Sequence, residues 1–404
     1  MKAMIGKRTF KIVVVGHVDH GKSTLIGRLL YDTGSLLSGK PVDFAFVVDQ
    51  LKEEREREMT IDTTQAFFHT KKHDYVIIDA PGHKEFIRNM ITGASQAETA
   101  ILVVDIVEGI QEQFRRHACF LKMLGIKEIS VVVNKMDLVS HKKEPFDKIR
   151  AKIELFAQVN KISFSEIIPI SARNGDNVAL KSKKMPWYSG PTLTGSLDRL
   201  RKPKDSAGKW LRMPVQDVYD IAGKKRIVGR IESGRVAKGE GLRVFPGDRK
   251  ACVSGIFEFG KNKKYAGCGE NIGLSITEDF PVKRGDMISD ENHKPVLTRR
   301  VAGNIFWMRQ MPFKITEKLV FRCNTQSTTC RISRIEKRID SATLKVLEKK
   351  AQSLAETDIG EVIIETGKTV IIEKFSVIPE LGRFILEKNG ITVAGGIITG
   401  AGVI

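Results

Sequence analysis

A glycine-rich stretch near the N-terminus, GHVDHGKST at residues 16–24, contains residue types that can bind a phosphate group. It fits the spacing GxxxxGK[ST], in which backbone N–H groups of the loop and of the following helix point at phosphate oxygens. Lys22 adds positive charge beside the β- and γ-phosphates, and the Ser23 hydroxyl can ligate Mg²⁺. Glycines at both ends of the loop permit a tight turn and a close approach. The residues predicted to hold the nucleotide phosphates are Gly16, His17, Val18, Asp19, His20, Gly21, Lys22, Ser23 and Thr24.

The two histidines of this loop raise a second interpretation, a zinc site. His17, Asp19 and His20 could supply ligands, but a structural zinc site needs further ones, and none follows nearby in the sequence. We therefore favour the phosphate loop and interpret the histidines as spacers between its amides. Asp19 is expected to stabilise the loop.

The sequence DAPGH at residues 79–83 follows an apolar run and predicts the part of the site that responds to the γ-phosphate. Asp79 can hold Mg²⁺ through a water, the N–H of Gly82 can contact the γ-phosphate, and His83 can position a hydrolytic water. Thr60, upstream, is expected to close on Mg²⁺ and the γ-phosphate, within a segment that orders with the bound triphosphate and relaxes after its hydrolysis. The predicted metal ligands are Ser23, Thr60 and Asp79, and the predicted catalytic residues are Lys22, Thr60 and His83.

The sequence NKMD at residues 134–137 predicts that the base is guanine. The Asp137 carboxylate can accept hydrogen bonds from the N1–H and the exocyclic amine of guanine, a donor pair that adenine lacks. The Lys135 stem can lie over the ring, and Asn134 can tie this loop to the phosphate loop. Downstream, Ser171, Ala172 and Arg173 can offer backbone N–H groups to the guanine O6. These motifs together predict binding of GTP and GDP with Mg²⁺.

The elements that must position these motifs are short apolar runs. FKIVVV, DYVIID, TAILVVD, ISVVVNK and EIIPIS alternate with helical stretches over the first 200 residues. Continuous Val/Ile runs indicate strands buried on both faces, and their alternation with helices favours a doubly wound, mostly parallel sheet. Ligands of such sheets bind at the carboxyl ends of the strands, where all of these runs except FKIVVV end in a polar residue.

The second half of the chain has a different pattern. Residues 199–210 form a linker rich in Lys, Pro, Gly and Ser, after which short alternating strands with Gly turns indicate β-barrels. A second break falls at residues 289–300. We expect an α/β P-loop GTPase domain over residues 1–204, followed by two β-barrel domains over 205–294 and 295–404.

Composition sets limits on location and partners. The chain of 404 residues has a net charge of +19, most of it after residue 200, which favours polyanions or acidic proteins as partners. The sequence contains no apolar stretch long enough for a membrane span and no signal-peptide pattern, and its five cysteines lack a CxxC pair. A cytoplasmic protein without a membrane partner is therefore expected.

The motifs GHVDHGKST, DAPGH and NKMD, followed by GRIESGRVAKG and RGDMI, resemble the translational-factor class of GTPases over essentially the whole chain. Within that class, QFRRH (113–117), MPWYSGPTL (185–193) and IFWMRQMPF (305–313) look like the large, GTPase subunit of bacterial sulfate adenylyltransferase. The structural alternative for Trp307, Met308 and Phe313 is a place in a barrel core.

This resemblance implies a coupled reaction. A separate catalytic small subunit would form adenosine 5′-phosphosulfate and pyrophosphate from ATP and sulfate, and GTP hydrolysis on this chain would drive it. The alternative is an elongation factor of the kind that delivers aminoacyl-tRNA, for which the positive charge suits tRNA or ribosomal RNA as partner. A regulatory GTPase with another partner is a third hypothesis.

The resemblance also implies details of the site. Val18 and Ile61 are expected to flank the hydrolytic water as an apolar gate. Glu58 and Met59 stand before Thr60, where the family usually has Gly and Ile. Glycine permits a backbone path there that glutamate resists, which leaves the geometry of this segment open.

Overall fold

The computed structural model describes residues 8–35, 65–78, 97–200, 208–221, 224–258, 261–315 and 317–402. The chain forms two compact units. The first unit comprises residues 1–201 with 340–345, and the second comprises residues 202–339 with 346–404. Among the described residues, no helix is long and apolar enough to cross a membrane.

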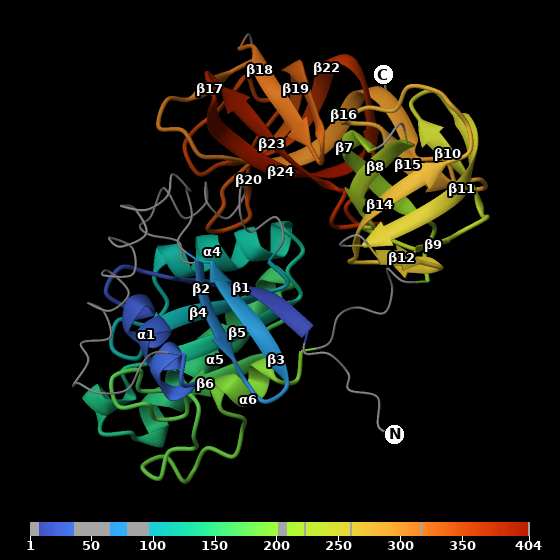
Figure 1. Ribbon diagram of the computed structural model, residues 1–404. Coiled ribbons are helices and arrows are strands. Elements are labelled where there is room, and N and C mark those ends of the chain that lie inside the picture. Colours follow the sequence, from blue (N-terminus) through green and yellow to red (C-terminus); the bar gives the residue numbers. More distant parts are fainter. Residues whose placement is uncertain are drawn as a thin grey trace. The chain divides into compact units, whose positions relative to one another are not determined.

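The first unit is an alternation of strands and helices (Figure 1). Its elements are β1 (Arg8–Gly16), α1 (Lys22–Asp32), β2 (Gln65–His69), β3 (His73–Ile78), β4 (Thr99–Asp105), α4 (Glu112–Met123), β5 (Glu128–Asn134), η2 (Met136–Val139), α5 (Lys143–Asn160), β6 (Glu166–Pro169) and α6 (Leu193–Leu197).

The strands of the first unit form one six-stranded sheet in the order β2-β3-β1-β4-β5-β6. Neighbouring strands from β3 to β6 pair in parallel, and β2 pairs with β3 in antiparallel fashion. All seven residues of β4 are buried, as expected for a strand covered on both faces. The predicted doubly wound, mostly parallel sheet is confirmed.

Helices cover both faces of this sheet. Leu25 and Leu29 of α1 and Leu193 of α6 share one apolar cluster with alternate residues of the strands. Phe114 of α4 packs against Phe156 of α5, with ring centroids 5.6 Å apart, outside that cluster. The order of strands reverses at β1, because β3 lies on one side of it and β4 on the other. Such a reversal is where open α/β sheets bind ligands.

The second unit consists of strands alone among its described residues. The first group is β7 (Arg212–Ile221), β8 (Lys224–Arg230), β9 (Arg235–Ala237), β10 (Gly241–Phe245), β11 (Arg249–Glu258), β12 (Lys261–Lys263), β13 (Tyr265–Gly267), β14 (Asn271–Ile276) and β15 (Met287–Asp290). The second group is β16 (Val296–Trp307), β17 (Phe313–Lys314), β18 (Leu319–Cys323), β19 (Gln326–Ile339), β20 (Val346–Lys349), β21 (Ser353–Leu354), β22 (Ile359–Ile372), β23 (Arg383–Lys388) and β24 (Ile391–Ala401).

Each group closes into a barrel. The first sheet runs β10-β15-β7-β8-β14-β11-β12, and an additional pairing of β10 with β11 closes it. The second sheet runs β18-β23-β24-β16-β22-β19-β20 and is closed by the pairing of β18 with β19. Closure removes most exposed strand edges. The predicted pair of β-barrels is confirmed.

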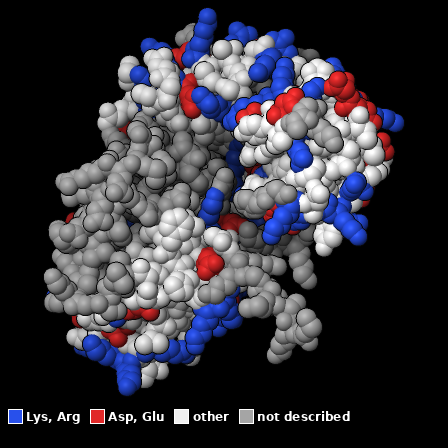
Figure 2. Space-filling view, in the orientation of Figure 1, with Lys and Arg blue, Asp and Glu red and all other residues white. Residues whose placement is uncertain are grey.

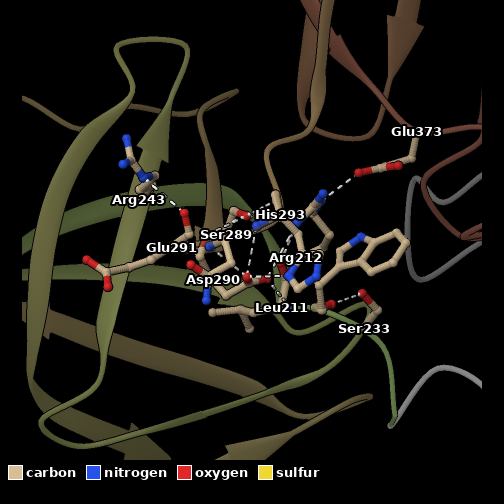
Figure 3. A network of polar contacts seen from close by, with 11 residues as sticks. Leu211, Arg212, Ser233, Arg243, Ser289, Asp290, Glu291, His293 and Glu373 are labelled. Atoms are coloured by element: carbon tan, nitrogen blue, oxygen red, sulfur yellow. Dashed lines mark hydrogen bonds and ion pairs between the residues drawn. The ribbon is translucent and has the colours of Figure 1, made fainter.

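A seam of buried side chains joins the two barrels (Figure 3). Its apolar part includes Phe245 and Met287 of the first barrel and Ile371 of the second. Beside it, Arg212 donates from Nε to Glu373 Oε1 at 2.6 Å and from Nη1 to the Ser289 hydroxyl at 2.8 Å. We call these residues the barrel seam.

Candidate nucleotide-binding site

The phosphate loop, residues 16–24, runs from the end of β1 into the first turn of α1. A Cβ at Gly16 would lie 2.6 Å from the carbonyl oxygen of Val103 in β4. Gly21 has a φ of 88°, and a Cβ there would lie 2.4 Å from Nδ2 of Asn134. Both positions therefore require glycine, because the loop passes too close to its neighbours for any side chain.

Lys22, Ser23 and Thr24 form the N-terminal turn of α1, where helix amides are available to an anion. The Lys22 ammonium donates to the carbonyl oxygens of Gly16 and His17, at 3.0 and 2.7 Å, and so lies inside the loop. Val18 and Asp19 are exposed at the tip of the loop. Asp19 has a φ of 61°, a left-handed conformation that aspartate tolerates better than most residues.

The two histidines of the loop are more than spacers. His17 Nδ1 lies 2.8 Å from Gln113 Oε1 at the start of α4. His20 is fully buried, and its Nε2 lies 3.1 Å from Glu108 Oε2. Its Nδ1 lies within 3.3 Å of both the carbonyl oxygen of Val103 and the amide of Asp105. The two imidazoles therefore connect the phosphate loop to the end of β4, to Glu108 in the turn after it, and to the start of α4.

Asn134 joins three parts of the site. Its Nδ2 donates to the carbonyl oxygen of His20 in the phosphate loop at 2.9 Å, which is the contact expected from the NKMD motif. Its Oδ1 accepts from the amide of Ala172 at 2.9 Å. Asn134 is buried, so both of its polar atoms are satisfied inside the protein.

Asp137 is oriented by Ser171, whose hydroxyl donates to Asp137 Oδ1 at 2.6 Å. The amide of Asn174 in turn donates to the Ser171 hydroxyl, and the amide of Met136 donates to the carbonyl oxygen of Ile170. The guanine loop, residues 134–137, is thus bound to the segment after β6. The side chain of Arg173 is exposed.

Lys135 contacts a residue that lies outside the sequence motifs. Its ammonium lies 2.6 Å from Oδ2 of Asp105, the last residue of β4. Burial works to raise the pKa of Asp105, but hydrogen bonds from Lys135 and from two amides outweigh it and hold the pKa below its ordinary value. The sequence does carry one signal for Asp105. It is the polar residue that ends the apolar run TAILVVD, which places it at the same edge of the sheet as the other loops.

The remaining predicted site residues lie outside the described part of the chain. They are the catalytic and metal-binding candidates Thr60, Asp79, Gly82 and His83, the gate residue Ile61, and the pair Glu58 and Met59.

Comparison with known proteins places the whole chain in one family. Residues 7–220 match the family described as elongation factor Tu GTP binding domain, and residues 300–399 match the GTP-eEF1A C-terminal domain-like family. The elongation factor 1-alpha of Pyrococcus horikoshii is 38% identical over 96% of each chain. That of Archaeoglobus fulgidus is 38% identical over 97% of each, and that of Methanopyrus kandleri 39% over 96% of this chain and 97% of its own. Crystal structures of sup35 with GDP and with GMPPNP are 26% identical, with TM-scores of 0.48 and 0.49.

These relatives overturn the expectation of a sulfate adenylyltransferase subunit and of its catalytic small subunit as partner. Three of the aromatic residues that suggested it have packing roles in this chain. Trp307 and Phe313 are fully buried in the core of the second barrel, with ring centroids 5.1 Å apart. Trp187 packs against Phe146 and donates from Nε1 to the carbonyl oxygen of His141 at 2.9 Å. These contacts are internal to the chain.

The family model for the GTP-binding domain covers more than half of the chain, and the full-length relatives are 38–39% identical to it. The chain belongs to the translation elongation factor family of GTPases, defined by the elongation factor Tu GTP-binding domain.

Proposed function

We propose that this chain is an elongation factor 1-alpha-like GTPase that delivers aminoacyl-tRNA during translation. The observation that carries the proposal is full-length similarity to proteins of that name, 38% identity over 96% of this chain. The net charge of +19 supports a polyanionic partner such as tRNA or ribosomal RNA. We expect the protein to act in the cytoplasm, where translation takes place.

In this proposal the amides of residues 16–24 and the Lys22 ammonium bind the phosphates. Ser23, in the first turn of α1, supplies a hydroxyl oxygen, the type of ligand that Mg²⁺ prefers, and would share the ion with Thr60 and Asp79. When bound, Mg²⁺ neutralises charge that develops on the γ-phosphoryl group. His83 would orient the attacking water, with Val18 and Ile61 beside it.

The base would be read by the guanine loop. The Ser171 hydroxyl fixes one oxygen of Asp137, which supports a carboxylate poised to accept from the N1–H and the amine of guanine. The amide of Ala172 donates to Asn134 Oδ1. When guanine is bound, its O6 atom would accept from the same amide, together with Asn134 Oδ1 or in place of it. The amides of Ser171 and Arg173 flank this position. The Lys135 stem would cover one face of the ring.

We also propose the division of the chain into a GTP-binding domain at residues 1–204 and barrels at 205–294 and 295–404. The strands of each barrel lie within these ranges. In this division the first domain changes with the nucleotide, and the barrels present the tRNA-binding surface.

The proposal predicts that aminoacyl-tRNA binds the GTP form selectively. The ester bond of aminoacyl-tRNA should be protected from hydrolysis by the full chain with a non-hydrolysable GTP analogue and Mg²⁺, but not by the GDP form. Deacylated tRNA at the same ionic strength is the control for charge-driven binding. Protection that is equal in both nucleotide forms, or absent from both, would contradict the proposal.

A further inference from the structure

The segment that follows β4, residues 105–109, carries a carboxylate to which the motifs give no role. Asp105 is the last residue of β4, and its side chain is 3% exposed. In the register of β4 and β5, Asp105 lies opposite Asn134, which is directly before Lys135. Burying a carboxylate is costly unless it is paired and hydrogen-bonded, so its partners should indicate its purpose.

The two oxygens of Asp105 have different partners. Oδ1 accepts from the amides of Val107 and Glu108, at 2.6 and 3.3 Å, which fixes the carboxylate to its own turn. Oδ2 lies 2.6 Å from the Lys135 ammonium. The turn therefore holds the carboxylate in place, and the carboxylate holds the lysine.

The conformation of Lys135 makes this contact consequential. Lys135 has a φ of 65°, in the left-handed region, and its side chain is 30% exposed. A lysine has a flexible four-carbon stem, which is strongly restricted when both of its ends are held. That stem is the part of Lys135 expected to lie over the guanine ring. Restricting it before the base arrives removes an entropic cost from binding.

We propose that Asp105 is a positioning residue for guanine binding, which pre-orders the Lys135 stem against which the base packs. The inference rests on the assignment of Lys135 and Asp137 to guanine in the proposed function. It does not depend on what the GTPase carries.

The test measures release of N-methylanthraniloyl-GDP from the full chain by stopped-flow fluorescence. Asp105→Asn should speed release about tenfold, the order expected from freeing one lysine side chain. Lys135→Met, which keeps the stem and removes the ammonium, should speed it by a similar factor. The double variant should match Lys135→Met to within about twofold, because both changes remove the same contact.

A matched control removes the same charge elsewhere in the first unit. Asp147 of α5 is exposed and lies 3.9 Å from the Lys143 ammonium. Asp147→Asn should release the nucleotide at the wild-type rate. A rate change there as large as that of Asp105→Asn would assign the effect to overall charge and overturn the inference.

Other outcomes decide the inference as well. If Asp105→Asn releases the nucleotide at the wild-type rate, the inference is overturned. It is also overturned if Asp105→Asn speeds release as much in the Lys135→Met background as in the wild-type chain, because Asp105 would then act through its own turn alone. If Asp105→Asn does not fold, Lys135→Met alone decides, and a wild-type rate overturns the inference. Failure of the wild-type chain to bind the nucleotide would overturn the guanine site itself, which is a separate result.

Discussion

The nucleotide loops of the first unit and the barrel seam of the second unit both bury polar side chains, but they use them differently. In the first unit, the hydrogen bonds of Asn134 with His20 and of Ser171 with Asp137 link three separate loops, and at most one group in each bond is charged. The ion pair of Lys135 with Asp105 differs from the seam because its lysine side chain is 30% exposed. At the barrel seam, Arg212 and Glu373 form a charge pair whose side chains are 2% and 8% exposed. Figure 2 shows lysines and arginines at the surface of the protein, whereas Arg212 is buried.

The difference indicates two mechanical roles. A hydrogen bond between neutral groups contributes about 1 kcal/mol, so loops joined by a few of them can separate without unfolding a domain. Breaking a buried charge pair by removing one partner costs about 3–5 kcal/mol. The first arrangement suits a site that must open to exchange its nucleotide, and the second suits a permanent joint between two barrels.

The largest effect is expected at the barrel seam. Glu373→Gln removes the charge opposite the buried Arg212 and should lower the free energy of unfolding of the second unit by about 3 kcal/mol. We place the value at the low end because Asp290 Oδ2 remains 3.9 Å from Arg212 Nη1. Urea unfolding followed by tryptophan fluorescence measures it, with Trp210 beside Arg212 as a reporter.

Affinity for GDP should remain unchanged in Glu373→Gln, because Glu373 contributes no contact to the described nucleotide loops. A loss of GDP affinity comparable to the loss of stability would show that the seam and the nucleotide site are not separate, and would break the comparison.

Buried cysteines in each unit can report their opening separately. Burial raises the pKa of Cys119, Cys323 and Cys330 to about 12, so at pH 8 these thiols should react with iodoacetamide only after local opening. GDP at 100 times its Kd stabilises the form that binds it by about 2.7 kcal/mol. Labelling of Cys119, in the first unit, should slow by up to about 100-fold, whereas Cys323 and Cys330 should be unaffected.

Mass spectrometry of the labelled peptides resolves the three sites, and the exposed Cys268 controls for reagent activity. Equal slowing at all three buried sites would mean that the two units open together.

Within the nucleotide loops, Asn134→Ala should have the strongest effect. It leaves the amide of Ala172 and the carbonyl of His20 without their side-chain partner. A total of about 2 kcal/mol is expected, which corresponds to roughly a 30-fold loss of GDP affinity by equilibrium fluorescence titration. The melting temperature of the second unit should not change. An affinity within about twofold of wild type would show that the loops are held together by other contacts.

The smallest effect is expected from a surface charge pair. Arg150 and Glu154 of α5 lie 2.8 Å apart, and both are about half exposed. Glu154→Gln should change the free energy of unfolding by about 0.3–0.5 kcal/mol, the usual value for an exposed i,i+4 pair. It is the matched control for Glu373→Gln, since both remove one carboxylate opposite an arginine. Equal effects at the two sites would remove the distinction based on burial.

The sequence predicts those strands and loops whose signal lies within a few neighbouring residues. The run TAILVVD coincides with β4, and the run ISVVVNK predicts β5. A strand that is buried on both faces consists of consecutive apolar residues, so it can be recognised in the sequence. The phosphate and guanine motifs are predicted for the same reason, since their spacing is local. The antiparallel edge strand β2 has no comparable signal.

Contacts between distant residues are not visible in one sequence. His20 and Glu108 are 88 residues apart, and Arg212 and Glu373 are 161 apart. Which polar residues meet depends on register and strand order, which apolar periodicity does not fix. The resemblance of Trp187 and Trp307 to another member of the same GTPase class is misleading for a related reason. Both rings pack inside this chain, and a shared packing position does not establish a shared function.

The most direct test combines the base assignment with the proposed cargo. Asp137→Asn replaces an acceptor of the guanine N1–H and amine by a side chain that suits xanthine, so XTP should replace GTP as the bound nucleotide. Binding of aminoacyl-tRNA to this variant is then measured with GTP and with XTP. We expect the variant to bind aminoacyl-tRNA with XTP and hardly with GTP, and the wild-type chain to do the reverse. Equal binding with both nucleotides, or none with XTP while the variant remains folded, would contradict it.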